Sequence, residues 1–70
     1  MPRKIRELKA DLRRAGFVVE PGKGSHTRWR HRRVPGRITL SGGDGDDALP
    51  YQEKDVRTTL RTLREAERND

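Results

Sequence analysis

Residues 22–31 carry the side chains of this chain that are best suited to chemistry. Their sequence is Gly-Lys-Gly-Ser-His-Thr-Arg-Trp-Arg-His, which holds both histidines and the only tryptophan of the protein. Imidazole titrates near neutral pH, so a histidine can accept or donate a proton during a reaction. Guanidinium groups bind phosphoryl oxygens and stabilise the charge that develops on them. His26, followed by Arg28 and Arg30, is therefore a candidate general acid or base beside a bound phosphate.

The alternation of side chains from Ser25 onward predicts a β-strand. His26, Arg28 and Arg30 then share one face, which we interpret as a working surface. The opposite face would pack into the core and carries Thr27, Trp29 and His31.

The two ends of this stretch add candidate phosphate ligands. Lys23 and the backbone amides of Gly24 and Ser25 could cradle a phosphate as a concavity of N–H groups. Arg32, the last residue of the predicted strand, and Arg33 continue the basic run.

Three neighbouring side chains have plainer interpretations. Trp29 is expected in the core rather than as a platform for stacked bases, and His31 shares its face as a packed or edge histidine. Ser25 has no evident carboxylate–histidine relay to activate it as a nucleophile, so a role in the turn is favoured.

The distribution of charge indicates a polyanion as partner. The net charge is +6, with 13 arginines against 4 lysines. Between Glu20 and Asp44 there is no acid, and the bases there are Lys23, Arg28, Arg30, Arg32, Arg33 and Arg37. Arginine binds phosphate with two donors and stacks on bases, so we favour nucleic acid over a merely solubilising surface.

The size of the chain predicts one domain with a thin core, because only 29% of its 70 residues are hydrophobic. A homo-oligomer or a complex with another protein would stabilise so small a core. The chain has no cysteine, which excludes disulfides and thiolate metal sites and agrees with a reducing compartment. No apolar run approaches a membrane span, and no signal peptide is visible. We expect a cytoplasmic protein with no membrane, metal or cofactor.

Two helices are predicted. The first covers residues 2–15 and ends at Gly16, and its apolar stripe is formed by Ile5, Leu8, Leu12 and Ala15. The second covers residues 50–66 and begins at a point between Pro50, a good first-turn residue, and Asp55, a good N-cap.

Three short strands are predicted over residues 17–20, 25–32 and 37–40. Pro35-Gly36 fits a type II turn between the last two strands. Residues 41–48 are expected to form a mobile acidic loop, which lacks the length and the closing glutamate of a calcium-binding EF-hand.

The order α-β-β-β-α predicts an α+β fold. Its three-stranded antiparallel sheet would be covered by both helices on one face and stay open on the other. The strand side chains expected beneath the helices are Phe17, Val19, Trp29, Ile38 and Leu40.

Four features together carry a resemblance to a known family. The amphipathic residues 5–12 run into Gly16-Phe17, the turn Lys-Gly-Ser-His follows at residues 23–26, an aromatic residue stands three positions after the histidine, and the last helix contains Val-Arg-Thr-Thr-Leu at residues 56–60. In this combination, which covers about residues 4–66, the chain resembles the HicA-type toxins of bacterial toxin–antitoxin systems, also called YcfA-like proteins. The chain departs from that pattern in its acidic residues 41–47, where the family usually has a proline and often a second histidine, and in Arg28, where many relatives have an apolar residue.

The resemblance implies a fold similar to a double-stranded-RNA-binding domain. It also implies an mRNA interferase that cleaves RNA and is neutralised by a cognate HicB-like antitoxin. His26 stands at the position of the histidine that the family needs for activity.

Two alternatives stay open at this point. One is a non-catalytic RNA-binding module of the same fold, although residues 51–55 lack the lysine cluster that such modules place at the start of their second helix. The other is an interaction protein whose basic face binds an acidic protein.

Overall fold

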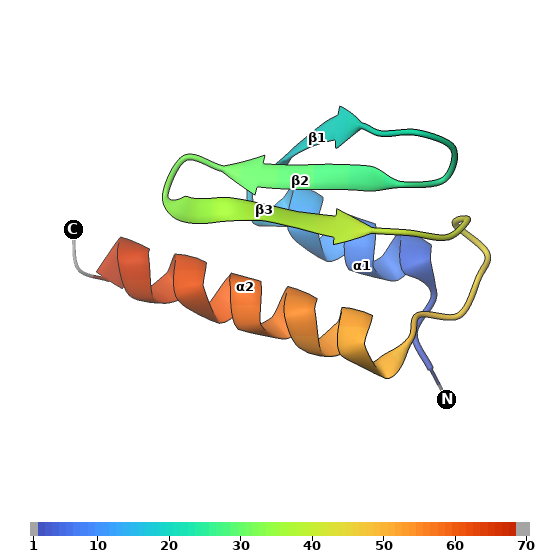
Figure 1. The fold of residues 1–70 in the computed structure, drawn as a ribbon. Helices are drawn as coiled ribbons and strands as arrows, with labels where there is room; N and C mark the ends of the chain where they lie inside the picture. The colour runs from blue at the N-terminus through green and yellow to red at the C-terminus, as the bar shows by residue number, and fades with distance from the viewer. Residues whose placement is uncertain (1, 69–70) are drawn as a thin grey trace.

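The computed structural model describes residues 2–68 and has the predicted order α-β-β-β-α (Figure 1). The predicted domain, residues 1–70, includes positions 1, 69 and 70, which lie outside the described residues. The elements are α1 (Ile5–Arg14), β1 (Val18–Pro21), β2 (Thr27–His31), β3 (Val34–Leu40) and α2 (Pro50–Arg68).

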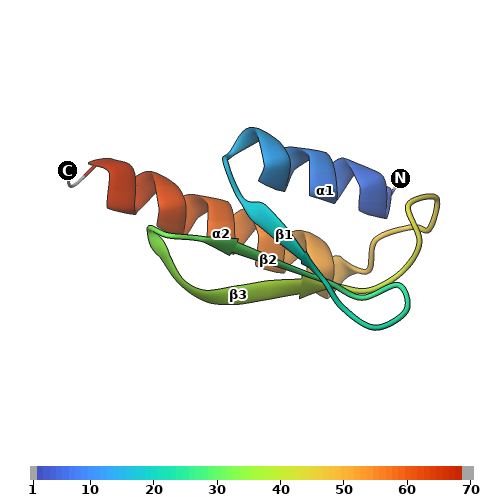
Figure 2. The same ribbon diagram turned by 90° about the horizontal axis from the view of Figure 1, so that it is seen from above.

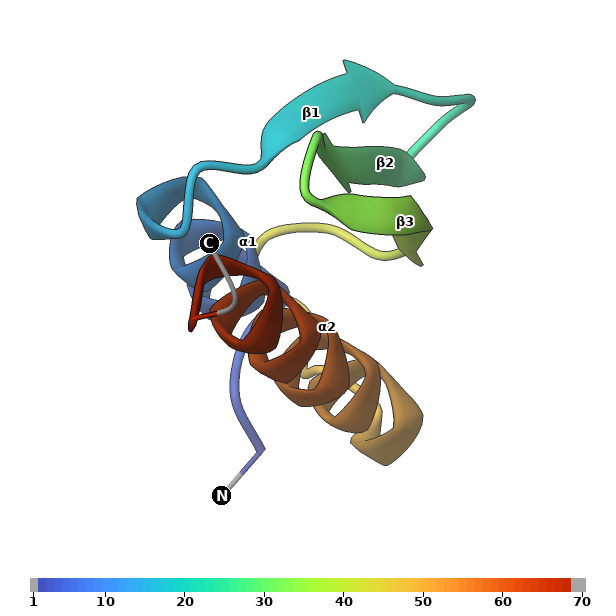
Figure 3. The same ribbon diagram turned by 90° about the vertical axis from the view of Figure 1, so that its left-hand side faces the viewer.

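The three strands form one antiparallel sheet in the order β1-β2-β3, with β2 in the centre. Both helices lie on the same side of this sheet, and the other side is open (Figure 3). The predicted α+β architecture is therefore confirmed.

Trp29 lies at the centre of the core between the sheet and the helices and is fully buried. Its indole N–H donates a hydrogen bond of 3.0 Å to Oγ1 of Thr27, and the guanidinium of Arg13 lies 5.2 Å from the ring centroid, a cation–π distance. The apolar residues buried in this core are Ile5, Leu8, Leu12, Phe17, Trp29, Ile38, Leu40, Ala48, Val56 and Leu63.

Val19 does not join this core, contrary to the prediction. It pairs with Trp29 and shares its face, yet 37% of its surface is exposed. The reason is position: β1 is an edge strand, and α2 packs on β3 at the opposite edge of the sheet. The alternation of the strand was right, but the helices do not extend over it.

The hairpin between β2 and β3 differs from the predicted one. His31 pairs with Val34, so residues 32–33 form a two-residue turn, and the predicted type II turn at Pro35-Gly36 is wrong. Gly36 has φ +77° and lies inside β3, where the register with β2 shifts, as expected for a β-bulge. Pro35 is tolerated there because an edge strand has N–H groups without a partner strand. The Pro-Gly pair misled the prediction because this pair fits a β-bulge as well as a type II turn.

Helix α2 begins at Pro50, one of the two predicted starts, and Asp55 lies inside it. The backbone N–H of Leu49 donates to Oε1 of Gln52 at 2.8 Å, and the side-chain amide of Gln52 donates to the carbonyl of Ser41 at 3.0 Å. Gln52 is buried. Its side chain therefore caps α2 and also ties the helix to the end of β3.

The loop between β3 and α2 folds back onto the start of α1 (Figure 2). The backbone N–H groups of Ile5 and Arg6 donate to the carbonyls of Asp46 and Asp44, at 2.9 and 3.2 Å. These donors are left without partners inside any helix, so the loop acts as the cap of α1. This cap explains why the helix begins at Ile5 rather than at residue 2.

The acidic side chains of this loop are also paired. Lys9 Nζ lies 2.7 Å from the carboxylate of Asp44, and Lys4 pairs with Asp47. The sequence predicts a mobile loop; in the structure its backbone is bound to the start of α1, and the carboxylates of Asp44 and Asp47 pair with Lys9 and Lys4.

Candidate functional site

The open face of the sheet carries the polar side chains that the alternation of β2 predicts. Arg28 and Arg30 are exposed on either side of the buried Trp29. In the pairing of the strands, Arg28 lies between Glu20 on β1 and Thr39 on β3. The open face is therefore a polar row across all three strands.

The loop between β1 and β2 places His26 at the end of this face. The N–H of Gly22 donates to the carbonyl of His26 at 3.0 Å, and the N–H of His26 donates to the carbonyl of Lys23 at 3.1 Å. The second bond closes a β-turn over residues 23–26. Gly24 has φ +60° at the second position of that turn, a conformation that glycine adopts without strain.

Gly22 is required for a different reason. A Cβ atom at this position would lie 2.8 Å from the carbonyl oxygen of His26, closer than such contacts occur in proteins. The backbone on which the histidine is mounted therefore packs directly against a residue without a side chain.

His26 opens onto a hollow that has basic side chains beside the imidazole. The imidazole is exposed, and its ring makes no hydrogen bond to any residue in the range 2–68. Lys23 and Arg28 also form no ion pair within the described chain. The hollow is lined by Pro21, Gly22, Lys23, His26, Arg28 and Thr39.

The turn itself leaves hydrogen-bond donors available. Among residues 2–68, the N–H groups of Gly24 and Ser25 donate to no carbonyl or side chain. The hydroxyl of Ser25 accepts a bond of 3.3 Å from the N–H of Gly42, which links the turn to the loop after β3. The structure therefore brings Lys23, Gly24, Ser25, His26 and Arg28 together, and the side chain of Ser25 contacts the loop after β3 rather than its own turn.

Arg30 does not stand beside His26 as an unpaired cation. Its Nε lies 3.0 Å from one carboxylate oxygen of Glu20, whose other oxygen accepts from Nε of Arg37 at 2.8 Å. The bond from Arg37 is the main reason why the pKa of Glu20 lies below its usual value. Sequence analysis missed this acid because it precedes the basic run; only the strand pairing brings it onto the same face.

Arg32 and Arg33 lie at the far end of β2 from His26, in the β2–β3 turn. The N–H of Arg33 donates to Nδ1 of His31 at 3.0 Å. The His31 ring packs on Phe17 with 5.1 Å between centroids. His31 is thus a packed histidine, and the structure does not bring these residues into the hollow around His26.

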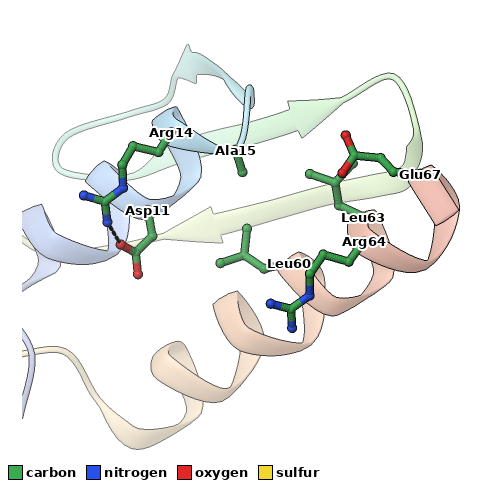
Figure 4. Close-up of a pocket in the computed structure, with 7 residues that line it drawn as sticks. All are labelled: Asp11, Arg14, Ala15, Leu60, Leu63, Arg64 and Glu67. Carbon is green, nitrogen blue, oxygen red and sulfur yellow. Dashed lines mark hydrogen bonds and ion pairs between the residues drawn. The ribbon is translucent and has the colours of Figure 1, made fainter.

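A second, apolar groove lies between α1 and α2, on the side of the molecule away from the open face (Figure 4). Its floor is formed by Ala15, Leu60 and Leu63. Asp11 at its rim is paired with Arg14 and with Arg3, and the bond from Arg3 is the main cause of the lowered pKa of this carboxyl. No histidine is among the residues that line this groove.

Within residues 2–68, no three His, Asp or Glu side chains gather closely enough to hold a metal ion. None of the helices in that range combines the length and the apolar character of a membrane span.

The match to a known family covers almost the whole of this architecture. Residues 5–67 match the family model described as the HicA toxin of bacterial toxin–antitoxin systems. No match was found among curated proteins or among solved structures. The matched range includes α1, the sheet, the turn that carries His26 and all but the last residue of α2. The chain therefore belongs to the HicA family of toxins from bacterial toxin–antitoxin systems.

Proposed function

We propose that this toxin is a metal-independent endoribonuclease that cleaves mRNA, with His26 as its general acid–base. One observation carries the proposal: the exposed imidazole shares a single hollow with Lys23 and Arg28, at the end of an open basic sheet. Proton transfer and phosphate binding can therefore occur at the same place. Family membership supports a toxin, and RNA is the polyanion that contains its own nucleophile.

The chemistry follows from the groups in the hollow. His26 would accept the proton of the ribose 2′-hydroxyl while the 2′-oxygen attacks the adjacent phosphorus. The bond from phosphorus to the 5′-oxygen then breaks, and protonated His26 can return the proton to this leaving oxygen. The products are a 2′,3′-cyclic phosphate and a 5′-hydroxyl. Lys23, Arg28 and the amides of Gly24 and Ser25 would stabilise the charge on the non-bridging oxygens.

The toxin family implies an antitoxin as partner. We infer that it is HicB-like and that it inhibits by covering the open face, because RNA must enter the hollow from that side. We also propose that the toxin is cytoplasmic, because mRNA is found in that compartment.

The test compares purified wild type with His26→Ala on a labelled single-stranded RNA in the presence of EDTA. We expect cleavage by the wild type and a loss of at least a hundredfold in the variant, within the range that a single general base contributes. His31→Asn is the matched control, because the second histidine packs on Phe17 and should leave cleavage within threefold. Circular dichroism of each variant checks the fold.

Unchanged cleavage by His26→Ala would refute its catalytic role. If all three proteins bind the RNA and none cleaves it, the protein is a non-catalytic RNA-binding module. Binding to an acidic partner protein without any affinity for RNA would indicate an interaction protein instead.

A further inference from the structure

Two arginines on the open face are held by one carboxylate. Glu20 accepts from Nε of Arg30 with one oxygen and from Nε of Arg37 with the other, at 3.0 and 2.8 Å. Neither guanidinium uses its Nη groups in a hydrogen bond within residues 2–68. Both arginines are about half exposed, at 49% and 52% of the side chain. The cluster therefore keeps a net charge of +1 and four NH₂ groups that can reach solvent.

The backbone is shaped to bring these arginines together. Glu20 lies on β1, Arg30 on β2 and Arg37 on β3, so the cluster spans the whole sheet. The bulge at Gly36 shifts the register of β3 against β2 immediately before Arg37. Bulges often redirect a side chain in this way.

We propose that Arg30 and Arg37 form a second phosphate subsite, for an RNA phosphate other than the one cleaved, and that Glu20 positions them. The inference rests on the proposed RNA cleavage and deepens it. Arg30 lies two residues beyond Arg28 along β2, about 7 Å for an extended strand. When a single-stranded RNA lies along β2 with one phosphate in the His26 hollow, the next phosphate along the RNA would therefore reach Arg30 and Arg37.

Glu20 has two opposing effects on an RNA phosphate. Its charge repels the phosphate, which weakens binding. Its bonds to Nε fix two long side chains that otherwise lose rotamer freedom on binding, which strengthens binding. In the proposal the second effect, the fixing of the two arginines, is the larger one. Each bond to Glu20 uses only Nε, so the Nη groups of both arginines stay available for the RNA phosphate.

The experiment measures the affinity of the full chain for a fluorescein-labelled single-stranded RNA by anisotropy. All variants carry His26→Ala, so that the RNA is not cut during the measurement. Arg30→Gln and Arg37→Gln should each weaken binding by three- to tenfold at 0.1 M salt. Each should also reduce the slope of log K against log salt by about 0.7, the value for one lost phosphate contact on a single strand. Arg61→Gln, an exposed arginine on α2, is the matched control and should change affinity less than twofold.

Glu20→Ala separates the two effects of the carboxylate. It should weaken binding about threefold where both arginines are present. In the Arg30→Gln, Arg37→Gln background it should strengthen binding, since only the repulsion is then removed. Stronger binding in both backgrounds would show that Glu20 only neutralises the arginines and would overturn its positioning role.

Arg37→Lys tests the guanidinium itself. It keeps the charge but cannot bind Glu20 and a phosphate through separate nitrogens in the same way, and should lose affinity nearly as far as Arg37→Gln. Strong RNA binding with both glutamine variants equal to the control would refute the subsite alone. Absence of RNA binding by the parent protein would refute the proposed function together with the subsite.

Discussion

Substitution of Gly22 by alanine should impair cleavage although residue 22 has no side chain that could act in the reaction. The new Cβ would lie 2.8 Å from the carbonyl oxygen of His26, whereas ordinary contacts begin at 3.4 Å. The backbone of His26 or that of residue 22 must therefore shift, by about 0.6 Å to restore an ordinary contact. The obstacle is backbone rather than a flexible side chain, so a rotamer change cannot relieve it.

The size of both effects follows from this displacement. A misplacement of about 1 Å in a reacting group can cost about a hundredfold in rate, so about 0.6 Å corresponds to roughly a tenfold loss of RNA cleavage. The hydrogen bond from Gly22 N–H to the His26 carbonyl is strained by the same movement. Its loss costs about 1 kcal/mol, which in a domain of this size lowers Tm by about 4–8 °C.

The assay combines initial rates of RNA cleavage with thermal unfolding of the same preparations. Gly45→Ala is the matched control, because a Cβ there meets no atom within 4 Å and its φ is not positive. That variant should cleave and melt like the wild type. Wild-type cleavage by Gly22→Ala would refute the argument that this contact positions His26.

Three further predictions concern stability and binding. Gln52→Ala should cost about 1–3 kcal/mol in a thermal or urea titration, because it removes a buried side chain and leaves the part-buried carbonyl of Ser41 and N–H of Leu49 without their partner; an unchanged Tm would contradict the capping role. Because Arg3 lowers the pKa of Asp11, this pair should stabilise the fold above about pH 4 and lose that effect as the pH falls through the lowered pKa. Asp11→Asn should therefore reduce the loss of unfolding free energy between about pH 4 and lower pH. An unchanged pH dependence would contradict the stabilising role of the Arg3–Asp11 pair. If about four phosphates are contacted, RNA affinity should fall with a log–log salt slope of about −3, and a flat response would exclude electrostatic binding.

The order of elements could be predicted from the sequence because each depends on local periodicity. The alternation of side chains in this strand predicts Trp29 in the core and Arg28 on the open face, and the structure confirms both positions. Val19 shows the limit of this reasoning: parity assigns a face to a side chain but does not say how far the helices extend over that face.

The rest of the site depends on contacts between segments distant in sequence. Glu20 meets Arg37 only through the register of three strands and a bulge. The pairing of Asp44 with Lys9 joins residues 35 positions apart. No spacing rule reports such contacts. The turn before His26 could be predicted from the sequence because the residues that form it, Gly22 among them, are neighbours in the chain.

The cap of α1 also constrains the order in which the chain can fold during synthesis. The first amides of this helix bind carbonyls of residues 44 and 46, and the N–H of Ala48 in turn binds the carbonyl of Arg3. While the ribosome is still making the sheet, the N-terminal helix has no partner for these donors. This cap can form only after residues 44–48 have left the exit tunnel, so the arrangement around the start of α1 is completed after the residues of the sheet have been made.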